Sequence, residues 1–550
     1  MTLNMESTVF DNMSMTPAIL LLSLAAGGLC WLYLTATSGI HSSSLPLPPG
    51  PSQLPFVGNL HQTPQGPAWE TYQKWSLKYG PIMLLKNGTV SSIIINSFDI
   101  VKSHLQRKNA IYSHRQSFPF FERVGGGLSA AVMPYGPQWK LHRTWRNSVL
   151  KQTMTNRYRP LQEVEARQLL HEFLHKENVF TSSLRRFSAS VFLTIAYGTR
   201  ENTDTEEIHQ VEDAVRRIAY GSENAFSGRS MLSQFFPFLL GWLPAQWKSD
   251  ADQLHQTLHR IHDRRMRAAL RTPTWNWAKH YCEMAKGLPF KELTHAVGTI
   301  YEGAFSPYQV LRIIILAAVL HPDAARRVQE ELDRVVGKDR LPGFSDSPQL
   351  PFLNAFIKEA LRWRPFFPLG APRAAFQDDE CMGYRIPRES MVIVNDWGIG
   401  HDETVFPIPY EFDPERWVAD PNLPEIMFGF GQRGCPGRYL GYDSVFIVAA
   451  CIFWAFNMNC GPEGIVQEEM MKSEGDSSFF SAVPEFQATF EVRDELRRKV
   501  IEDQWLHAEK DSDTLLEQMM GTHLLEAIGN GSCVTASQEK REISNAMYSC

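Results

Sequence analysis

Long apolar runs with a helical period dominate this chain. Residues 439–456 carry a single charge in an otherwise apolar run, which predicts a helix buried on all sides. Residues 322–336 place apolar side chains at helical spacing among charged ones, begin with proline and are followed by Gly337, so we expect an amphipathic helix there. Since the pattern is mostly helical as far as Trp363, the chain should be mainly α.

Strand signals are short and few. Residues 82–86 and 91–96 are rich in isoleucine and leucine and flank the turn Asn87-Gly88, which predicts a hairpin. Shorter signals follow at residues 384–386 and 390–395. A small β region beside a mainly α domain is the expected fold class.

The first apolar run lies near the N-terminus. Between Asp11 and His41 there is no charge, and residues 18–37 are long enough to cross a bilayer once, so we expect a transmembrane anchor after an N-terminal segment of residues 1–17. A cleaved signal peptide is the alternative. No Lys or Arg flanks the run closely, so charge gives no orientation; glycosylation at Asn12 would place the N-terminus in the lumen.

Proline and polar residues mark the remaining boundaries. Residues 38–51 form a polar, then proline-rich linker, which is stiff and extended. Apolar residues are spread evenly over residues 52–504, which fits one large domain. Residues 505–550 are polar and are expected to be a disordered tail.

Composition excludes some classes of function. The net charge of −6 gives no basic field for nucleic acid. The eight cysteines show neither a CxxC pair nor zinc spacing, so we expect free thiols in a reducing compartment.

One of these cysteines lies in a glycine-rich loop that leads into the apolar run. The loop reads Phe428-Gly-Phe-Gly-Gln-Arg433-Gly-Cys435-Pro-Gly437. A thiolate there would lie at a helix N-terminus, where backbone N–H groups and the helix dipole should lower its pKa. Glycine lets the backbone approach a flat ligand closely. A buried structural cysteine is the alternative.

This pattern resembles the haem-binding signature of the cytochrome P450 family, and residues 45–504 are most like the microsomal enzymes of filamentous fungi that tailor secondary metabolites. The resemblance implies haem b with Cys435 as the axial iron ligand, and Phe428 and Gly437 beside the cofactor. It also implies oxidation of an apolar small molecule by O2, with electrons from NADPH through a cytochrome P450 reductase. The enzyme would be anchored in the endoplasmic reticulum membrane with its catalytic domain in the cytosol.

Two further motifs support the resemblance. Glu359 and Arg362, three apart on one helical face, and Arg416 resemble a glutamate bracketed by two arginines, which has a structural role. Trp139 and Arg143, four apart, match a helix that binds haem propionates, with His142 a less certain neighbour. Arg373 and Arg433 lie where relatives place further propionate donors.

The presumed oxygen-binding helix departs from the family pattern. Relatives show a glycine followed by an acid and a threonine; aligning Gly303 with that glycine puts Phe305 at the acid and Ser306 at the threonine. Glu302, four residues before Ser306, could replace the acid as a proton source, or could be a surface residue. Pro307 should kink this helix.

The residues at the positions that deliver protons differ from the family pattern, and this leaves alternatives to hydroxylation. These are oxidative cyclisation, coupling or rearrangement without net hydroxylation, and a haem protein that binds ligand without turnover. Aromatic residues should line an apolar substrate pocket, among them Phe118, Phe120, Phe121, Phe366 and Phe367. The cations Lys140, Arg146 and Arg438 could form a docking face for the reductase.

Overall fold

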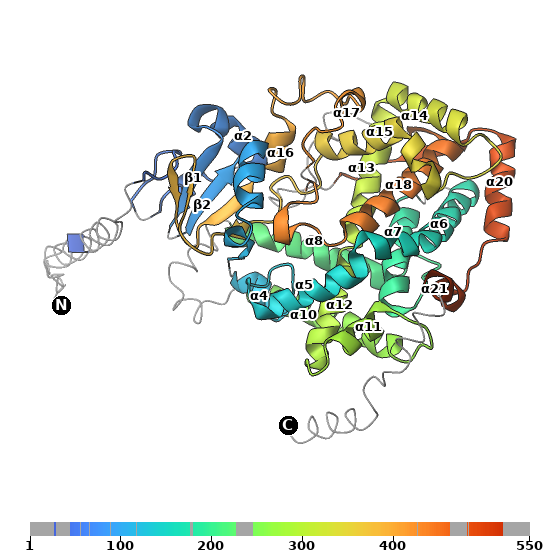
Figure 1. Ribbon diagram of the computed structural model, residues 1–550, viewed down its shortest axis with the longest axis horizontal. Coiled ribbons are helices and arrows are strands. Elements are labelled where there is room, and N and C mark those ends of the chain that lie inside the picture. The colour runs from blue at the N-terminus through green and yellow to red at the C-terminus, as the bar shows by residue number, and fades with distance from the viewer. Residues whose placement is uncertain are drawn as a thin grey trace, which may run out of the picture.

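The computed structural model describes residues 45–520 with gaps at 56, 65, 89, 117, 177–179, 227–245, 426, 462–480 and 482, and also residues 27 and 28 (Figure 1). The predicted anchor therefore lies almost wholly outside the described residues, as does the sequon at Asn12. Only two described helical stretches, Phe290–Leu320 and Arg438–Ala455, are long and apolar enough to cross a membrane. Both are largely buried inside the domain, so they are core helices.

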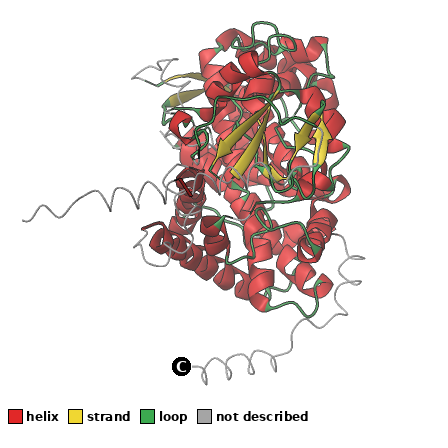
Figure 2. Cartoon of the chain, turned by 90° about the vertical axis from the view of Figure 1, so that its left-hand side faces the viewer, coloured by secondary structure: helices red, strands yellow, loops and turns green. Residues whose placement is uncertain are grey.

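Strands are few among the helices (Figure 2), and the largest sheet lies at the end of the molecule where β1 and β2 are labelled (Figure 1). The four-stranded sheet has the order β1-β2-β6-β3, with β1 at Ile82–Asn87, β2 at Val90–Ile95, β6 at Met391–Val394 and β3 at Arg373–Ala374. β1 and β2 are antiparallel around Gly88, whose φ of 62° suits a tight turn. β2 runs parallel to β6. The two-stranded sheets are β4 (Asp379–Cys381) with β5 (Tyr384–Ile386), and β7 (Phe456–Cys460) with β8 (Ala488–Val492).

Helices make up the rest of the domain, as predicted. In the first half they are α2 (Ala68–Tyr79), α3 (Phe98–Ile100), α4 (Pro119–Gly125), α5 (Pro137–Leu150), α6 (Gln152–His175), α7 (Phe180–Tyr197), α8 (Glu206–Phe226) and α10 (Gln246–Ala269). In the second half they are α11 (Trp277–Met284), α12 (Phe290–Glu302), α13 (Phe305–Leu320), α14 (Pro322–Val335), α15 (Pro351–Trp363), α16 (Asp396–Gly400), α17 (Glu415–Ala419), α18 (Arg438–Ala455), α20 (Glu495–Leu506) and α21 (Ser512–Met520).

Short turns of other helical types complete the described chain. They are the 3-10 turns η1 (Leu60–Gln62), η3 (Ile111–Ser113), η5 (Phe344–Gln349) and η6 (Gly431–Arg433), and the π-helical η2 (Val101–Gln106).

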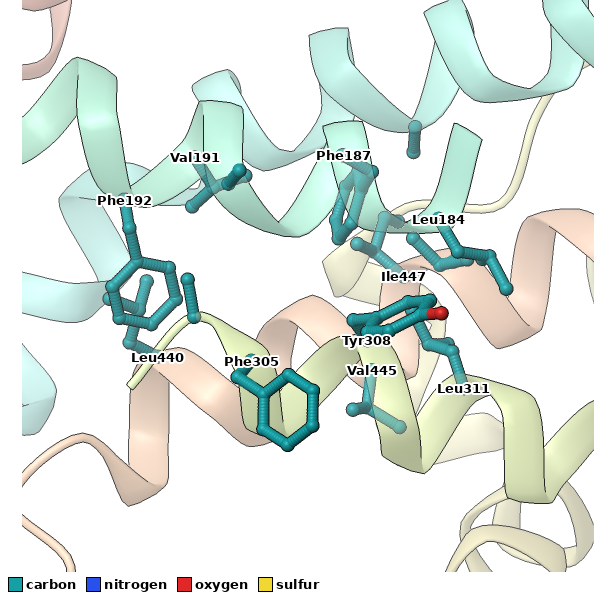
Figure 3. Close-up of a cluster of buried hydrophobic side chains, with 14 of the residues drawn as sticks. Leu184, Phe187, Val191, Phe192, Phe305, Tyr308, Leu311, Leu440, Val445 and Ile447 are labelled. Carbon is teal, nitrogen blue, oxygen red and sulfur yellow. The ribbon is translucent and has the colours of Figure 1, made fainter. Parts of the chain in front are cut away.

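The helices α7, α13 and α18 form the centre of the core. Their apolar side chains interdigitate, with Phe187, Tyr308 and Ile447 meeting from the three helices (Figure 3). α18 is the buried helix that the apolar run at residues 439–456 predicted, and α14 is the predicted amphipathic helix. This rigid core fixes the loop that precedes α18.

The predicted kink is present as a break between two helices. α12 ends at Glu302 and α13 begins at Phe305, with Gly303 and Ala304 in a turn between them. Pro307 lies in the first turn of α13, where a backbone N–H has no acceptor within the helix. The N–H that proline lacks would have pointed back toward the break, so its absence costs α13 no hydrogen bond. The Ser188 hydroxyl of α7 donates a hydrogen bond to the carbonyl of Ala304 in this turn. The neighbouring helix α7 therefore supplies a hydrogen-bond donor to the backbone at the break.

Part of the segment that we expected to be a disordered tail is ordered. α20 continues to Leu506, and α21 packs Leu515, Leu516, Met519 and Met520 into the core. These four side chains have helical spacing and cover one face, a short signal that the polar composition of the segment hides. Residues 521–550 lie outside the described part of the chain.

Candidate active site

A cavity of about 640 Å³ opens between the break in the α12–α13 stretch and the loop before α18. Its walls come from α5, from the segment after η3, from the chain that follows α15, and from residues 427–437. Thr299, Gly303 and Ser306 line it from the α12–α13 stretch, and Cys435 lines it from the loop before α18. The core helices therefore hold two chemically different surfaces at one cavity.

The cysteine loop is shaped by its backbone. The Cys435 N–H donates to the Phe428 carbonyl at 2.7 Å, and Gly431 takes a φ of 58°, which favours glycine. A Cβ on Gly437 would lie 4.0 Å from the Cys435 sulfur. Phe428 and Gly437 both line the cavity, as predicted from the motif. The loop presents one accessible thiol to the cavity.

The expected lowering of the thiol pKa does not occur. Burial raises the pKa of Cys435 above its ordinary value, and the Gly437 N–H, Arg146 and Arg438 offset this only in part. The helix N-terminus acts in the predicted direction, but desolvation of the thiolate is larger. A bound metal ion would deprotonate the thiol directly.

Arginines gather at the cavity. Arg143 and Arg433 lie on the ring of Trp139, at 5.5 and 4.2 Å from its centroid. Arg373 stacks on Phe430 at 3.8 Å and donates to the Phe430 carbonyl. Burial and the charges of Arg115, Arg146, Arg373 and Arg143 lower the pKa of Arg433 to about 8. The site thus holds positive charge that an anion would stabilise.

These groups fit haem, whose two propionates are anions. One terminal nitrogen of Arg373 is buried without a hydrogen-bond partner among the described residues, so the site has a donor to spare for an acceptor. The cavity, the single thiol and the arginines together suit a flat, dianionic iron porphyrin. Trp139, Arg143, Arg373 and Arg433 would hold the propionates, and Cys435 the iron.

Two neighbouring predictions need adjustment. His142 is buried and bonded to Glu292 at 2.9 Å and to Tyr281, so it does not point to a propionate. Arg146 lines the cavity, whereas Lys140 and Arg438 are exposed. Only two of the three cations predicted for docking therefore lie on the open surface.

The predicted glutamate–arginine cluster assembles behind the cavity. Arg362 donates to both Glu359 oxygens at 2.7 and 2.8 Å, and Arg416 donates to one of them at 3.1 Å. The Trp417 indole and the Asp413 backbone N–H complete the set at 2.9 and 2.8 Å. Glu359 is fully buried, so its charge depends on these donors.

The structure separates Ser306 from Glu302. Ser306 lines the cavity, and its hydroxyl makes no hydrogen bond within the described structure. Glu302 is not among the lining residues; its carboxylate bonds to His262 of α10 at 2.9 Å. The carboxylate therefore belongs to the contact between α10 and α12, and the expected partnership with Ser306 is not assembled.

The remaining walls are mostly apolar. Phe118, Phe121, Phe366 and Phe367 line the cavity, but Phe120 packs in the core. Two further lining residues, Arg115 and Asp396, were not predicted. Arg115 follows His114, which bridges to Ala374, and Asp396 follows β6. Neither residue belongs to a recognisable sequence motif, because it is the sheet that brings them to the cavity.

A mainly helical fold with a thiol facing an arginine-lined cavity defines a haem-thiolate protein. The chain belongs to the cytochrome P450 family, whose model matches residues 48–490. It is 46% identical to fumitremorgin C synthase of Neosartorya fischeri over 90% of this chain and 97% of that protein. It is 44% identical to the cytochrome P450 monooxygenase okaD of Penicillium ochrochloron, over 86% of this chain and 91% of that one.

A solved structure shares the fold. A zebra fish cytochrome P450 with abiraterone superposes with a TM-score of 0.64 at 21% identity, covering 78% of this chain and all of that one. The family assignment establishes a haem-dependent monooxygenase that resembles fungal enzymes of secondary metabolism. It does not favour the alternatives without net hydroxylation or without turnover.

Proposed function

We propose that this monooxygenase carries out a tailoring oxidation on an apolar, fungal secondary metabolite of the same general kind as fumitremorgin C. The observation that carries this proposal is the apolar cavity between Cys435 and Ser306 in a chain 46% identical to fumitremorgin C synthase. The aromatic walls suit a polycyclic molecule, because they offer large apolar area at fixed positions.

Each residue of the site would have a separate role in the reaction. Bound haem supplies the activation of dioxygen. Cys435 holds the iron, and Trp139, Arg143, Arg373 and Arg433 orient the porphyrin through its propionates. Ser306 offers a hydroxyl that can pass a proton across the cavity. Phe366 and Phe367 hold the substrate and exclude water.

Electron supply and location follow from the same assignment. The described chain carries the P450 domain, so we infer that NADPH-cytochrome P450 reductase delivers the electrons to the cysteine side, near exposed Lys140 and Arg438. Residues 18–37 would anchor the protein in the endoplasmic reticulum membrane. Glycosylation of Asn12 would follow if the N-terminus lies in the lumen.

Reconstitution tests this function. Membranes that contain the protein and its reductase should consume NADPH and O2 and convert a compound from fungal extract into one heavier by one oxygen. Cys435→Ala should abolish this product and the thiolate band of the reduced carbon monoxide spectrum, whereas Cys460→Ala, an exposed cysteine of β7, should retain both. A normal thiolate spectrum without any product across an extract panel would contradict the proposed oxidation.

A further inference from the structure

The cavity contains a carboxyl group that the haem site does not use. Asp396 is the first residue of α16, separated from β6 by Asn395, and it lines the cavity although only 8% of it is exposed. The Asn395 side chain already caps α16 by accepting from the Gly398 N–H at 3.1 Å. Asp396 is therefore not needed to begin this helix.

Asp396 accepts no hydrogen bond and forms no ion pair within the described part of the chain. Burial raises its pKa well above the ordinary value, and the charge of Arg373 opposes this without direct contact. Arg373 instead bonds and stacks on Phe430. A buried carboxyl without a partner is costly in a protein interior, so its presence at a cavity wall points to a ligand that supplies the missing contact.

Because residue 370 is glycine, no side chain at that position covers the Asp396 carboxyl. A Cβ on Gly370 would lie 3.7 and 3.8 Å from the two Asp396 oxygens. The nearby residues Phe367 and Ala371 line the cavity together with Asp396. Gly370 has a φ of 54°, which other residues adopt only with strain.

A second acceptor lies on the same side of the cavity. The side-chain oxygen of Gln116 is buried without a partner among the described residues, and Gln116 lines the cavity. Because His114 forms a β-bridge with Ala374, the segment that contains Gln116 lies beside residues 372–374. Two unused acceptors in one region call for a hydrogen-bond donor.

The charge of the site decides which donor fits. Arg115, Arg143, Arg146 and Arg433 border the same cavity, and their mutual repulsion is strong enough to help lower the pKa of Arg433 to about 8. A cationic ligand would enter this positive field at a cost, even after two propionates are bound. A neutral N–H or O–H group carries no such cost.

We propose that Asp396 is a specificity-determining residue that binds a neutral N–H or O–H donor on an otherwise apolar substrate. This inference rests on the proposed function, because it assumes that the substrate occupies the cavity beside the haem. It narrows the substrate class to apolar ring systems that carry an uncharged donor. Substrates of the same shape without the donor leave the carboxyl unpaired and bind less tightly.

Matched probes test the proposal in the ferric, haem-loaded protein without turnover. Carbazole and dibenzofuran, and 2-phenylindole and 2-phenylbenzofuran, are pairs of nearly equal shape in which only one member has an N–H. The wild type should bind the N–H member about three- to tenfold more tightly, the value of one net hydrogen bond. Asp396→Leu should abolish this preference, and Asp396→Asn should retain part of it.

A backbone control separates shielding from strain. Gly370→Ala places a methyl group against the carboxyl and should weaken the N–H preference. Gly383→Ala, at a φ of 78° with nothing within 4 Å of the added carbon, introduces similar strain far from the cavity and should leave the preference unchanged.

Two results would overturn the proposal. The first is equal affinity for both members of each pair in the wild type, or an unchanged preference in Asp396→Leu. The second is a lowered haem content in Asp396→Leu whose remaining haem-loaded fraction keeps the N–H preference, which would show that Asp396 only balances Arg373. Failure of the proposed function would appear separately, as an absence of NADPH-dependent product from a protein whose probe binding is normal.

Discussion

At the scale of single residues, the site is defined by polar groups without partners. Two hydroxyls on the α12–α13 stretch face the cavity, but they differ in what they bind. Thr299 donates to the carbonyl of His295 at 2.8 Å, whereas the Ser306 hydroxyl makes no hydrogen bond in the described structure. Only Ser306 is therefore free to bond to a ligand or to pass on a proton.

Ser306→Ala should leave the haem spectrum intact and raise the share of NADPH that ends as hydrogen peroxide, so that the ratio of product to peroxide falls by about 10- to 100-fold. The reason is that the cavity loses its one uncommitted hydroxyl on this helix. Thr299→Val is the matched control, and its coupling should stay near that of the wild type. Unchanged coupling in Ser306→Ala, measured as product and peroxide per NADPH, would exclude the hydroxyl from proton transfer.

At the scale of elements, helices carry the site and a buried charge cluster joins them. Glu359 of α15 links Arg362 on the same helix to Arg416 and Trp417 on α17. Arg362 also donates to the carbonyls of Gly400 and Pro409. One carboxylate thus fixes α15 against α16, α17 and the loop between them.

Glu359→Ala should lower the free energy of unfolding by about 3–5 kcal/mol, because two arginines lose their buried counter-charge. Haem content should fall with it. Denaturant unfolding of purified protein provides the measurement, with Glu330→Ala on the exposed face of α14 as a control that should change stability by less than about 0.5 kcal/mol. A stable Glu359→Ala variant would show that the cluster does not hold these elements together.

The contact between α10 and α12 should be sensitive to acid. His295 of α12 lies beside His255 and His259 of α10, with ring centroids 5.4 and 5.2 Å away, and Lys291 and His262 face it as well. Burial, and then the charges of these neighbours, lower the pKa of His295 from 6.5 to about 3.

Between these two values the unfolded chain binds a proton that the folded chain does not, so stability should fall as the pH drops below about 6.5. His295→Gln should flatten this dependence, measured by urea unfolding at several pH values. His507→Gln, at an exposed histidine, should keep the wild-type slope. An equal slope in wild type and His295→Gln would show that His295 does not cause the loss of stability in acid.

At the scale of the whole molecule, the sheet region and the helical region meet at the cavity. Arg373 comes from β3, Arg143 from α5 and Arg433 from η6, so three distant segments place positive charge at one point. Without an anion these charges repel each other: burial first, and then the charges of neighbouring arginines that include Arg373 and Arg143, lower the pKa of Arg433 to about 8. Cofactor and fold should therefore stabilise each other.

Removal of haem should lower the temperature of unfolding, because the arginines lose the propionates. Sulfate should then raise the unfolding temperature of the haem-free protein more than chloride does at equal ionic strength. Sulfate stabilises folded proteins in general, so the advantage of sulfate over chloride should be larger in the haem-free form than in the haem-loaded form. Calorimetry on both forms measures this, and an equal advantage in the two forms would contradict the role of the arginines.

The sequence by itself determined the helical class, the buried helix α18, the first hairpin and the cysteine loop. Each has a local cause, such as an uninterrupted apolar run, an Asn-Gly turn or a glycine beside a thiol. The places of Trp139, Arg143 and Arg433 at the cavity also followed from short motifs, whereas Arg373 is not one of the residues that line it. The predicted anchor and the last thirty residues stay predictions.

Only the tertiary structure decided how the polar groups are paired. Glu302 and Ser306 are close in sequence, but the break after α12 and the contact with His262 turn the carboxylate away. Asp396 and Gly370 are distant in sequence and meet because β6 and the segment before β3 run side by side. Burial likewise outweighs the helix N-terminus at Cys435, since desolvation depends on everything packed around a group, and that is fixed only when the chain has folded.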